Sequence, residues 1–152
     1  MSPRQLINIT VASITFILLT SCRQSKVDGV IIGNALYENQ DYATNKRLCD
    51  IINRTLDKDQ QALIELTEFS CGGAAGCYDL GYVLTQIINR LGEKEFIKLI
   101  NGLTEKQKNE INELIIVGLE YGDNDYDGKM DGTTISATFP ELEQALTKKN
   151  GS

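Results

Sequence analysis

The densest group of side chains that could do chemistry lies near residue 125, where carboxylates alternate with other residues. The run reads DNDYDGKMD over residues 123–131. Oxygen atoms at alternate positions can face one side of a tight turn, where a hard cation offsets the mutual repulsion of the carboxylates. The sequence therefore predicts a weak calcium site whose ligands would be Asp123, Asp125, Asp127, Asp131 and the backbone carbonyl of Lys129.

This run resembles the first nine positions of an EF-hand calcium loop. Acidic residues stand at positions 1, 3, 5 and 9, and Gly128 occupies position 6, where the loop turns sharply. Thr134 stands at position 12 in place of the bidentate glutamate, so the resemblance implies a dissociation constant on the order of 10⁻⁴–10⁻³ M. The alternative is a solvated turn, which Asp, Asn and Gly also favour.

An apolar segment precedes the first cysteine of the chain. It runs from Leu6 to Leu19, follows a single cation, Arg4, and ends at small residues before Cys22. These 14 residues would span about 21 Å as a helix, which is shorter than the roughly 30 Å hydrocarbon core of a bilayer. The segment is therefore predicted to be part of an export signal rather than a permanent transmembrane helix.

Residues 19–22, Leu-Thr-Ser-Cys, resemble the bacterial lipobox. The resemblance implies that residues 1–21 are a cleaved signal peptide and that Cys22 carries a covalent lipid, which anchors the protein in the bilayer. Arg23 stands where an aspartate would retain the protein at the inner membrane, so the outer membrane of a bacterial cell envelope is favoured. An ordinary secretory signal and an uncleaved anchor helix are the alternatives. The polar residues 22–29 are predicted to form a short tether.

The remaining cysteines are expected to meet an oxidising compartment. Cys71 and Cys77 flank Gly-Gly-Ala-Ala-Gly, a linker flexible enough for a local disulfide that would close the turn between two helices. Pairing of Cys49 with Cys71 or with Cys77 is the alternative. Anion binding by the glycine-rich stretch is disfavoured, because the stretch lacks a lysine and Asp79 follows it.

The composition narrows the classes of function. The chain has 15 Lys and Arg, 21 Asp and Glu, a formal net charge of −6 and no histidine. Catalysis by Ser-His-Asp or Cys-His groups and histidine-ligated zinc or haem are therefore excluded. The acidic balance without a basic cluster argues against nucleic acid as a partner. We expect no enzyme, although a small cell-wall hydrolase that uses two carboxylates is an alternative.

A small acidic helical lipoprotein of this kind resembles the periplasmic immunity proteins, which cover the active cleft of a basic toxic enzyme. The resemblance implies a non-catalytic module that binds a protein partner in the periplasm or at the cell surface. Candidate contacts are Tyr78 and Tyr82, one helical turn apart, with the acidic residues Glu65, Glu68 and Asp79, which are expected to be exposed. Core packing is the alternative for both tyrosines, and a calcium-stabilised structural envelope lipoprotein is the alternative for the whole chain.

Apolar residues recur with helical period through most of the remaining chain. The predicted helices run from about 41 to 56, from the 57–59 cap to 69, from just after 72–76 to 91, over 93–101, from a capping box at 104–107 to 122, and from an opening at 138–141.

The fold class predicted from this pattern is all-α. Residues 30–152 should form a single compact domain of five or six short helices, arranged as a bundle or as a short stack of helical hairpins. Residues 30–37 fit either a short strand or a first helix. Gly81 and Gly118 lie inside predicted helices, which suggests close backbone approach where helices cross.

Overall fold

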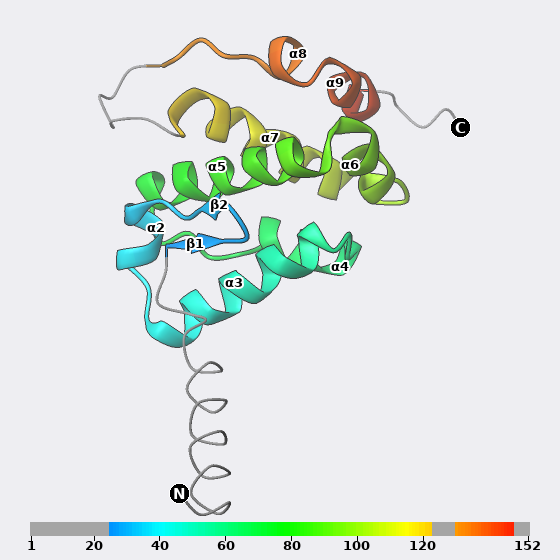
Figure 1. The fold of residues 1–152 in the computed structure, drawn as a ribbon. Coiled ribbons are helices and arrows are strands. Elements are labelled where there is room, and N and C mark those ends of the chain that lie inside the picture. Colours follow the sequence, from blue (N-terminus) through cyan, green and yellow to red (C-terminus); the bar gives the residue numbers. More distant parts are fainter. Residues whose placement is uncertain (1–24, 123–129, 148–152) are drawn as a thin grey trace, which may run out of the picture.

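The computed structural model describes residues 25–122 and 130–147, which form a mostly helical domain with one small sheet (Figure 1). The predicted all-α class is thus confirmed. The predicted signal peptide and Cys22 lie outside the described residues. Four of the predicted calcium ligands lie outside them as well, namely Asp123, Asp125, Asp127 and Lys129.

The described chain opens with a β-hairpin. Strands β1 (Lys26–Val27) and β2 (Val30–Ile31) pair antiparallel across an Asp-Gly turn at 28–29, both of whose residues have positive φ. Helix α2 (Asn34–Glu38) follows. Residues 30–37 therefore contain both of the elements between which the sequence left a choice. The hairpin also begins the folded domain four residues before the predicted boundary at residue 30.

Two capped helices form the next hairpin of the chain. Helix α3 (Tyr42–Leu56) begins after Asp41, and α4 (Gln60–Thr67) begins after Asp59. Each aspartate accepts hydrogen bonds from backbone N–H groups of the first turn, which stabilises the start of the helix. The predicted α4 reached Phe69, but the helix ends two residues earlier, and the ring of Phe69 lies in the core.

The longest helix, α5 (Ala74–Leu91), begins inside the glycine-rich stretch rather than after it, with Gly73 at its N-cap. Helix α6 (Glu93–Ile100) follows across a single glycine. Helix α7 (Glu105–Tyr121) begins with the predicted capping box, in which Thr104 and the third residue of the helix exchange hydrogen bonds.

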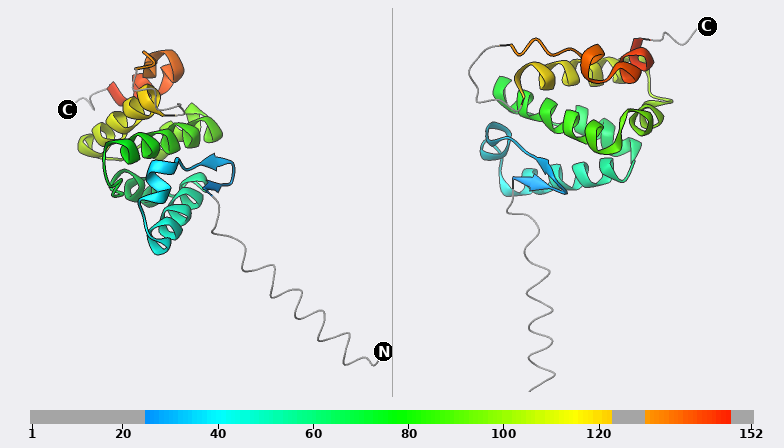
Figure 2. Two further views of the ribbon diagram at one scale, coloured as in Figure 1. Left: turned by 90° about the vertical axis from the view of Figure 1, so that its left-hand side faces the viewer. Right: turned by 45° about the horizontal axis from the view of Figure 1, so that its top comes forward.

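The C-terminal part holds two short helices where the sequence predicted one. Helix α8 (Ile135–Thr138) begins after Thr134, whose side chain accepts a hydrogen bond from Ala137 N–H. Helix α9 (Pro140–Thr147) then packs on α8 and α6, and both short helices also contact α7 (Figure 2).

Helix α5 lies in the middle of the domain (Figures 1 and 2). On one side it packs against α7, and on the other against α2, α3 and β2. Helices α5 and α7 meet at Gly81 and Gly118, where a Cβ atom on either glycine would overlap backbone atoms of the other helix. The predicted close approach of two helices at these glycines is therefore present.

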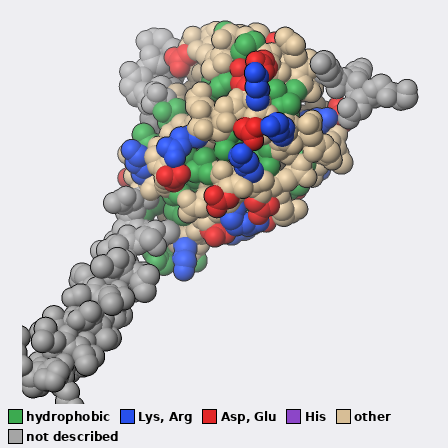
Figure 3. Space-filling model, turned by 45° about the vertical axis from the view of Figure 1, so that its right-hand side comes forward, with side chains coloured by type: hydrophobic (Ala, Val, Ile, Leu, Met, Phe, Trp, Pro, Cys, Tyr) green, Lys and Arg blue, Asp and Glu red, His purple; other side chains and the backbone are tan. Residues whose placement is uncertain are grey.

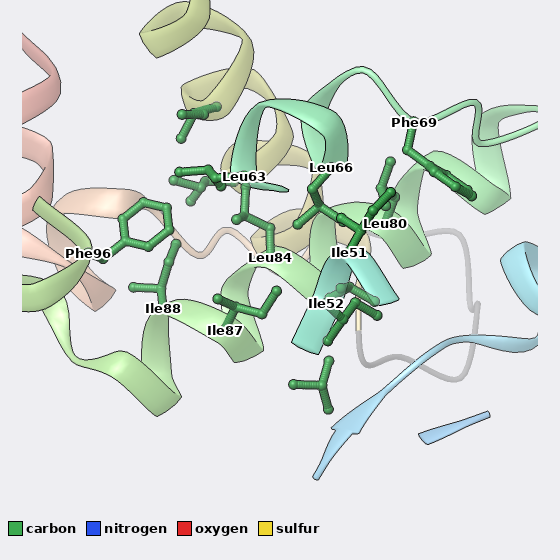
Figure 4. Close-up of a cluster of buried hydrophobic side chains, with 14 of the residues drawn as sticks. Ile51, Ile52, Leu63, Leu66, Phe69, Leu80, Leu84, Ile87, Ile88 and Phe96 are labelled. Atoms are coloured by element: carbon green, nitrogen blue, oxygen red, sulfur yellow. The ribbon is translucent and has the colours of Figure 1, made fainter. Parts of the chain in front are cut away.

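The core fills the space between α5 and the helices around it. Buried side chains of α3, α4, α5 and α6 interdigitate in one continuous cluster (Figure 4). The largest of them that Figure 4 labels are Ile51, Ile52, Leu63, Leu66, Leu80, Leu84, Ile87, Ile88 and Phe96. This burial stabilises the domain chiefly through the hydrophobic effect.

Candidate functional site

The predicted disulfide joins Cys71 and Cys77, whose Cα atoms lie 4.9 Å apart. It closes the turn between α4 and α5. Gly76 lies against this turn, and a Cβ atom there would overlap the carbonyl oxygen of Cys71. Cys49 is buried in the core and takes no part in the disulfide, so the two alternative pairings are absent.

The predicted contact residues Tyr78 and Tyr82 lie along the seam between α5 and α7. The ring of Tyr78 stacks on Tyr121 of α7, with the centroids 4.5 Å apart and the planes inclined by 21°. The Cβ atom of Tyr82 lies against Gly122, which has no room for a side chain. Both tyrosines are half-buried, so helix packing accounts for part of each ring. Contact with a partner through the remaining surface stays a prediction.

Asp79 was expected on the surface, and this expectation is wrong, because its side chain is buried at 4% exposure. Its carboxylate accepts a hydrogen bond of 2.8 Å from Leu36 N–H in the first turn of α2. Helix α2 has no side-chain cap of its own at Gly33, so Asp79 supplies the acceptor from the neighbouring helix. A Cβ atom at residue 33 would overlap this carboxylate. Asp79 therefore links α2 to α5 through a hydrogen bond.

Arg54 forms ion pairs with three carboxylates where α3 meets α4. Its guanidinium lies 2.7 Å from Asp59, 3.3 Å from Glu65 and 3.8 Å from Asp50. The hydrogen bonds from Arg54 lower the pKa of Asp59. Glu65 was predicted to contact a partner, but here it is half-buried and paired with the guanidinium, whereas Glu68 is exposed.

A second charged cluster lies where α6 approaches the turn between α3 and α4. Glu95 lies 2.8 Å from Lys58 and 2.6 Å from Lys98, and hydrogen bonds from the two ammonium groups lower its pKa to about 2. These residues, with Gln60 and Leu99, line a surface cavity of about 390 Å³. In Figure 3, basic and acidic side chains lie next to one another over the face turned forward. Glu95 thus compensates the cations of this cavity.

The last predicted calcium ligand, Asp131, is exposed beyond the C-terminal end of α7. Its N–H donates to the carbonyl of Glu120 at 3.3 Å, and Gly132 N–H donates to the Glu120 carboxylate at 3.3 Å. Thr134, the residue at loop position 12, has its hydroxyl oxygen engaged as the cap of α8. Within residues 25–122 and 130–147, no cluster of three or more Cys, Asp or Glu side chains could hold a metal ion.

Glu120 was missed by the sequence reasoning. It stands three residues before the acidic run, near the end of a helix predicted from its capping box and its apolar stripe. The signal that could have found it is its position, because a carboxylate in the last turn of a helix can accept a hydrogen bond from a backbone N–H later in the chain.

Comparison with known proteins gives no relative. The sequence matches no protein-family model, no curated protein and no solved structure. Among the helices that the structure describes, none is both long enough and apolar enough to cross a membrane.

Proposed function

We propose that the mature chain is a lipid-anchored, non-catalytic module that binds another protein in the bacterial cell envelope, in the manner of an immunity or inhibitor protein. The observation that carries the proposal is that the two clusters of charged side chains described above are ion pairs. Arg54 lies among three carboxylates, and Glu95 lies between two lysines.

This arrangement disfavours the alternative of a cell-wall hydrolase. Hydrolysis by two carboxylates needs one of them protonated near neutral pH, which requires a raised pKa. The pKa values of Asp59 and Glu95 are instead lowered by hydrogen bonds from cationic partners. Both groups are therefore charged at neutral pH, which suits ion pairs that hold helices together and does not suit a general acid.

The position of the first strand supports attachment close to a bilayer. Strand β1 begins at Lys26, so residues 23–25 alone would separate the domain from an anchor at Cys22. Three extended residues reach at most about 11 Å. An anchor at Cys22 would therefore hold the domain against the membrane surface, and a partner would have to meet the protein there.

The anchor and the binding function are tested separately. Metabolic labelling with palmitate should mark the full chain, and Cys22→Ser should abolish the label and release the protein from the membrane fraction. Ser25→Ala is the control and should keep both. Labelling that survives Cys22→Ser would refute the anchor.

For the binding function, the chain is produced together with the product of the gene that lies next to its own, where the target of an immunity-type protein is expected. The full chain is then purified from detergent-solubilised membranes. Stable co-purification and inhibition of that product support the proposal. Release of fragments from peptidoglycan by the purified chain would overturn it in favour of a hydrolase.

A calcium-stabilised structural role is the second candidate, and the hydrogen bonds from Asp131 and Gly132 to Glu120 favour it. These bonds hold the end of the acidic run against the end of α7. Calcium should raise the midpoint of thermal unfolding, and Asp125→Ala should remove the rise, whereas Glu113→Gln should keep it. No change at about 10 mM calcium, above the range expected for such a loop, would rule this role out.

A further inference from the structure

The outward face of α7 combines acidic and apolar side chains. Glu113, Ile116 and Glu120 are spaced i, i+3 and i+7, so they lie along one face of the helix. Glu113 is exposed, and Ile116, a large apolar residue, is 45% exposed.

The last two residues of the acidic run extend this face. The hydrogen bonds to Glu120 fix the backbone at Asp131 beside the end of α7, and the neighbouring Met130 is 65% exposed. We call this surface the α7 patch. It comprises Glu113, Ile116, Glu120, Met130 and Asp131.

Among the residues that the structure describes, no cation neutralises the carboxylates of the α7 patch. None of the three takes part in an ion pair within the described residues, and ranges 109–122 and 130–147 contain no Lys or Arg. The last cations before them, Lys106 and Lys108, are already paired with Glu110 and Glu105. Over residues 109–147 the full sequence has nine Asp and Glu against one Lys.

The α7 patch lies away from the point where the described chain begins. Helix α7 lies on one side of α5, and the hairpin with β1 lies on the other (Figures 1 and 2). An anchor next to β1 would therefore leave the patch turned to solvent. Its negative charge would also be kept away from anionic lipid head groups, which would repel it.

We propose that the α7 patch docks a basic protein, and this rests on the proposed binding function. Lys and Arg side chains of the partner would pair with Glu113, Glu120 and Asp131, and its apolar side chains would cover Ile116 and Met130. Because these carboxylates have no ion pair to break, binding gives up no internal salt bridge. Methionine adapts readily to an incoming apolar surface. A second copy of the chain is disfavoured, because it would bring like charges together.

The exposed apolar residues provide matched positions for photo-cross-linking in cells that make the full lipidated chain. Ile116 and Ile31 are both 45% exposed, and Met130 and Tyr42 are 65% and 66% exposed. A benzophenone side chain is introduced at one position at a time. We expect cross-links to one protein from positions 116 and 130 and none from the controls 31 and 42. Mass spectrometry should identify a partner with an excess of Lys and Arg.

The identified partner is then purified, and its affinity for the full chain is measured in detergent. Combining Glu113→Gln, Glu120→Gln and Asp131→Asn should weaken binding at least tenfold and flatten its salt dependence. The control combines Glu38→Gln and Asp57→Asn, which neutralise exposed carboxylates on the other side of α5, and it should leave affinity unchanged. Circular dichroism checks that each variant is folded.

The outcomes separate this inference from the proposed function. Cross-links to a protein from positions 31 or 42 alone would overturn docking at the α7 patch but keep a protein-binding function. A partner without excess positive charge, a cross-linked second copy, or equal losses in both sets of variants would also overturn it. No cross-link from any of the four positions would overturn both proposals.

Discussion

Helix α5 holds its neighbours in two different ways on its two sides. Toward α7 the contact is close and largely non-polar, with Gly81 against Gly118 and Tyr78 stacked on Tyr121. Toward the N-terminal segment the contact includes specific polar bonds.

The polar bonds come from one stripe of α5. Asp79 accepts from Leu36 N–H, Gln86 bonds both the N–H and the carbonyl of Ile31 at 2.9 Å, and Arg90 lies 2.8 Å from Asp28. The three side chains are spaced i, i+7 and i+11, so they follow one face of the helix.

The difference reflects what each side has to hold. Helix α7 has 17 residues and can bury a long apolar stripe against α5. The glycines at the crossing carry no side chain, so the two helices can pack closely there. The hairpin and α2 are too short to bury much surface, and two-stranded hairpins are marginally stable alone. Their position therefore depends on directional hydrogen bonds from α5. Mutations that act on one side and spare the other would test this contrast.

The largest effect should come from Gly118→Ala. The added Cβ would overlap the backbone of α5, and the helices would have to separate, so we expect a loss of about 3 kcal/mol in the free energy of unfolding. Urea unfolding followed by circular dichroism measures it. Ile116→Ala, on the exposed face of the same helix, should change stability by less than about 0.5 kcal/mol. An equal effect of the two would mean that the crossing is loosely packed.

On the polar side, Asp79→Ala should cost about 2 kcal/mol, because it leaves the buried N–H of Leu36 without this acceptor. Hydrogen exchange should become faster in α2 and remain slow in α7. Faster exchange throughout both helices would indicate that the two sides do not open separately, and the contrast would fail.

A smaller loss, about 1 kcal/mol, is expected from Gln86→Ala, which removes both bonds to Ile31. The amide of Ile31 should then exchange faster, with little change elsewhere. Gln144→Ala, a change of an exposed side chain on α9, serves as the comparison and should leave that amide protected. Protection of Ile31 that persists in Gln86→Ala would show that strand pairing alone holds the hairpin.

The smallest effect concerns the surface cavity beside α6, where Lys58 and Lys98 form ion pairs with Glu95. Its pKa lies at about 2 in the folded protein against an ordinary 4.5, so the stabilisation is present above pH 4.5 and is lost as pH falls toward 2. Urea midpoints measured across this range should fall less steeply in Glu95→Gln than in the native chain. Glu113→Gln should keep the native slope. An unchanged slope in Glu95→Gln would mean that solvent screens these pairs completely.

Sequence patterns predicted the helices well because burial of an apolar stripe imposes the helical period directly. The glycines of the α5–α7 crossing were also recognisable, since a glycine inside a helix destabilises it unless a neighbour needs the space. The sequence could not decide between strand and helix for residues 30–37, because strands of two residues are too short to display alternation. Asp79 was misjudged because nothing near it in sequence reveals that a helix 43 residues earlier needs a cap. Glu120 was overlooked because it bonds the backbone of residues on the far side of the acidic run.

The site could be predicted only in part for a related reason. Cys71 and Cys77 are close in sequence, so their pairing followed from local geometry. The α7 patch is defined by the absence of cations that pair with its carboxylates in the described elements around it, and its exposure depends on how the helices pack. Composition indicated an acidic protein. Only the fold shows which carboxylates have a cation beside them and which do not.

The hairpin has a mechanical consequence. Any pulling force applied to the chain from its amino-terminal end enters the domain near Ser25, whose carbonyl accepts a hydrogen bond of 2.8 Å from Ile32 N–H. Strand β1 passes the load to β2, and Gln86 and Arg90 pass it to the longest helix. The hairpin would therefore unfold first. The extended chain before the helices would become longer by a few residues, while the helices remain folded.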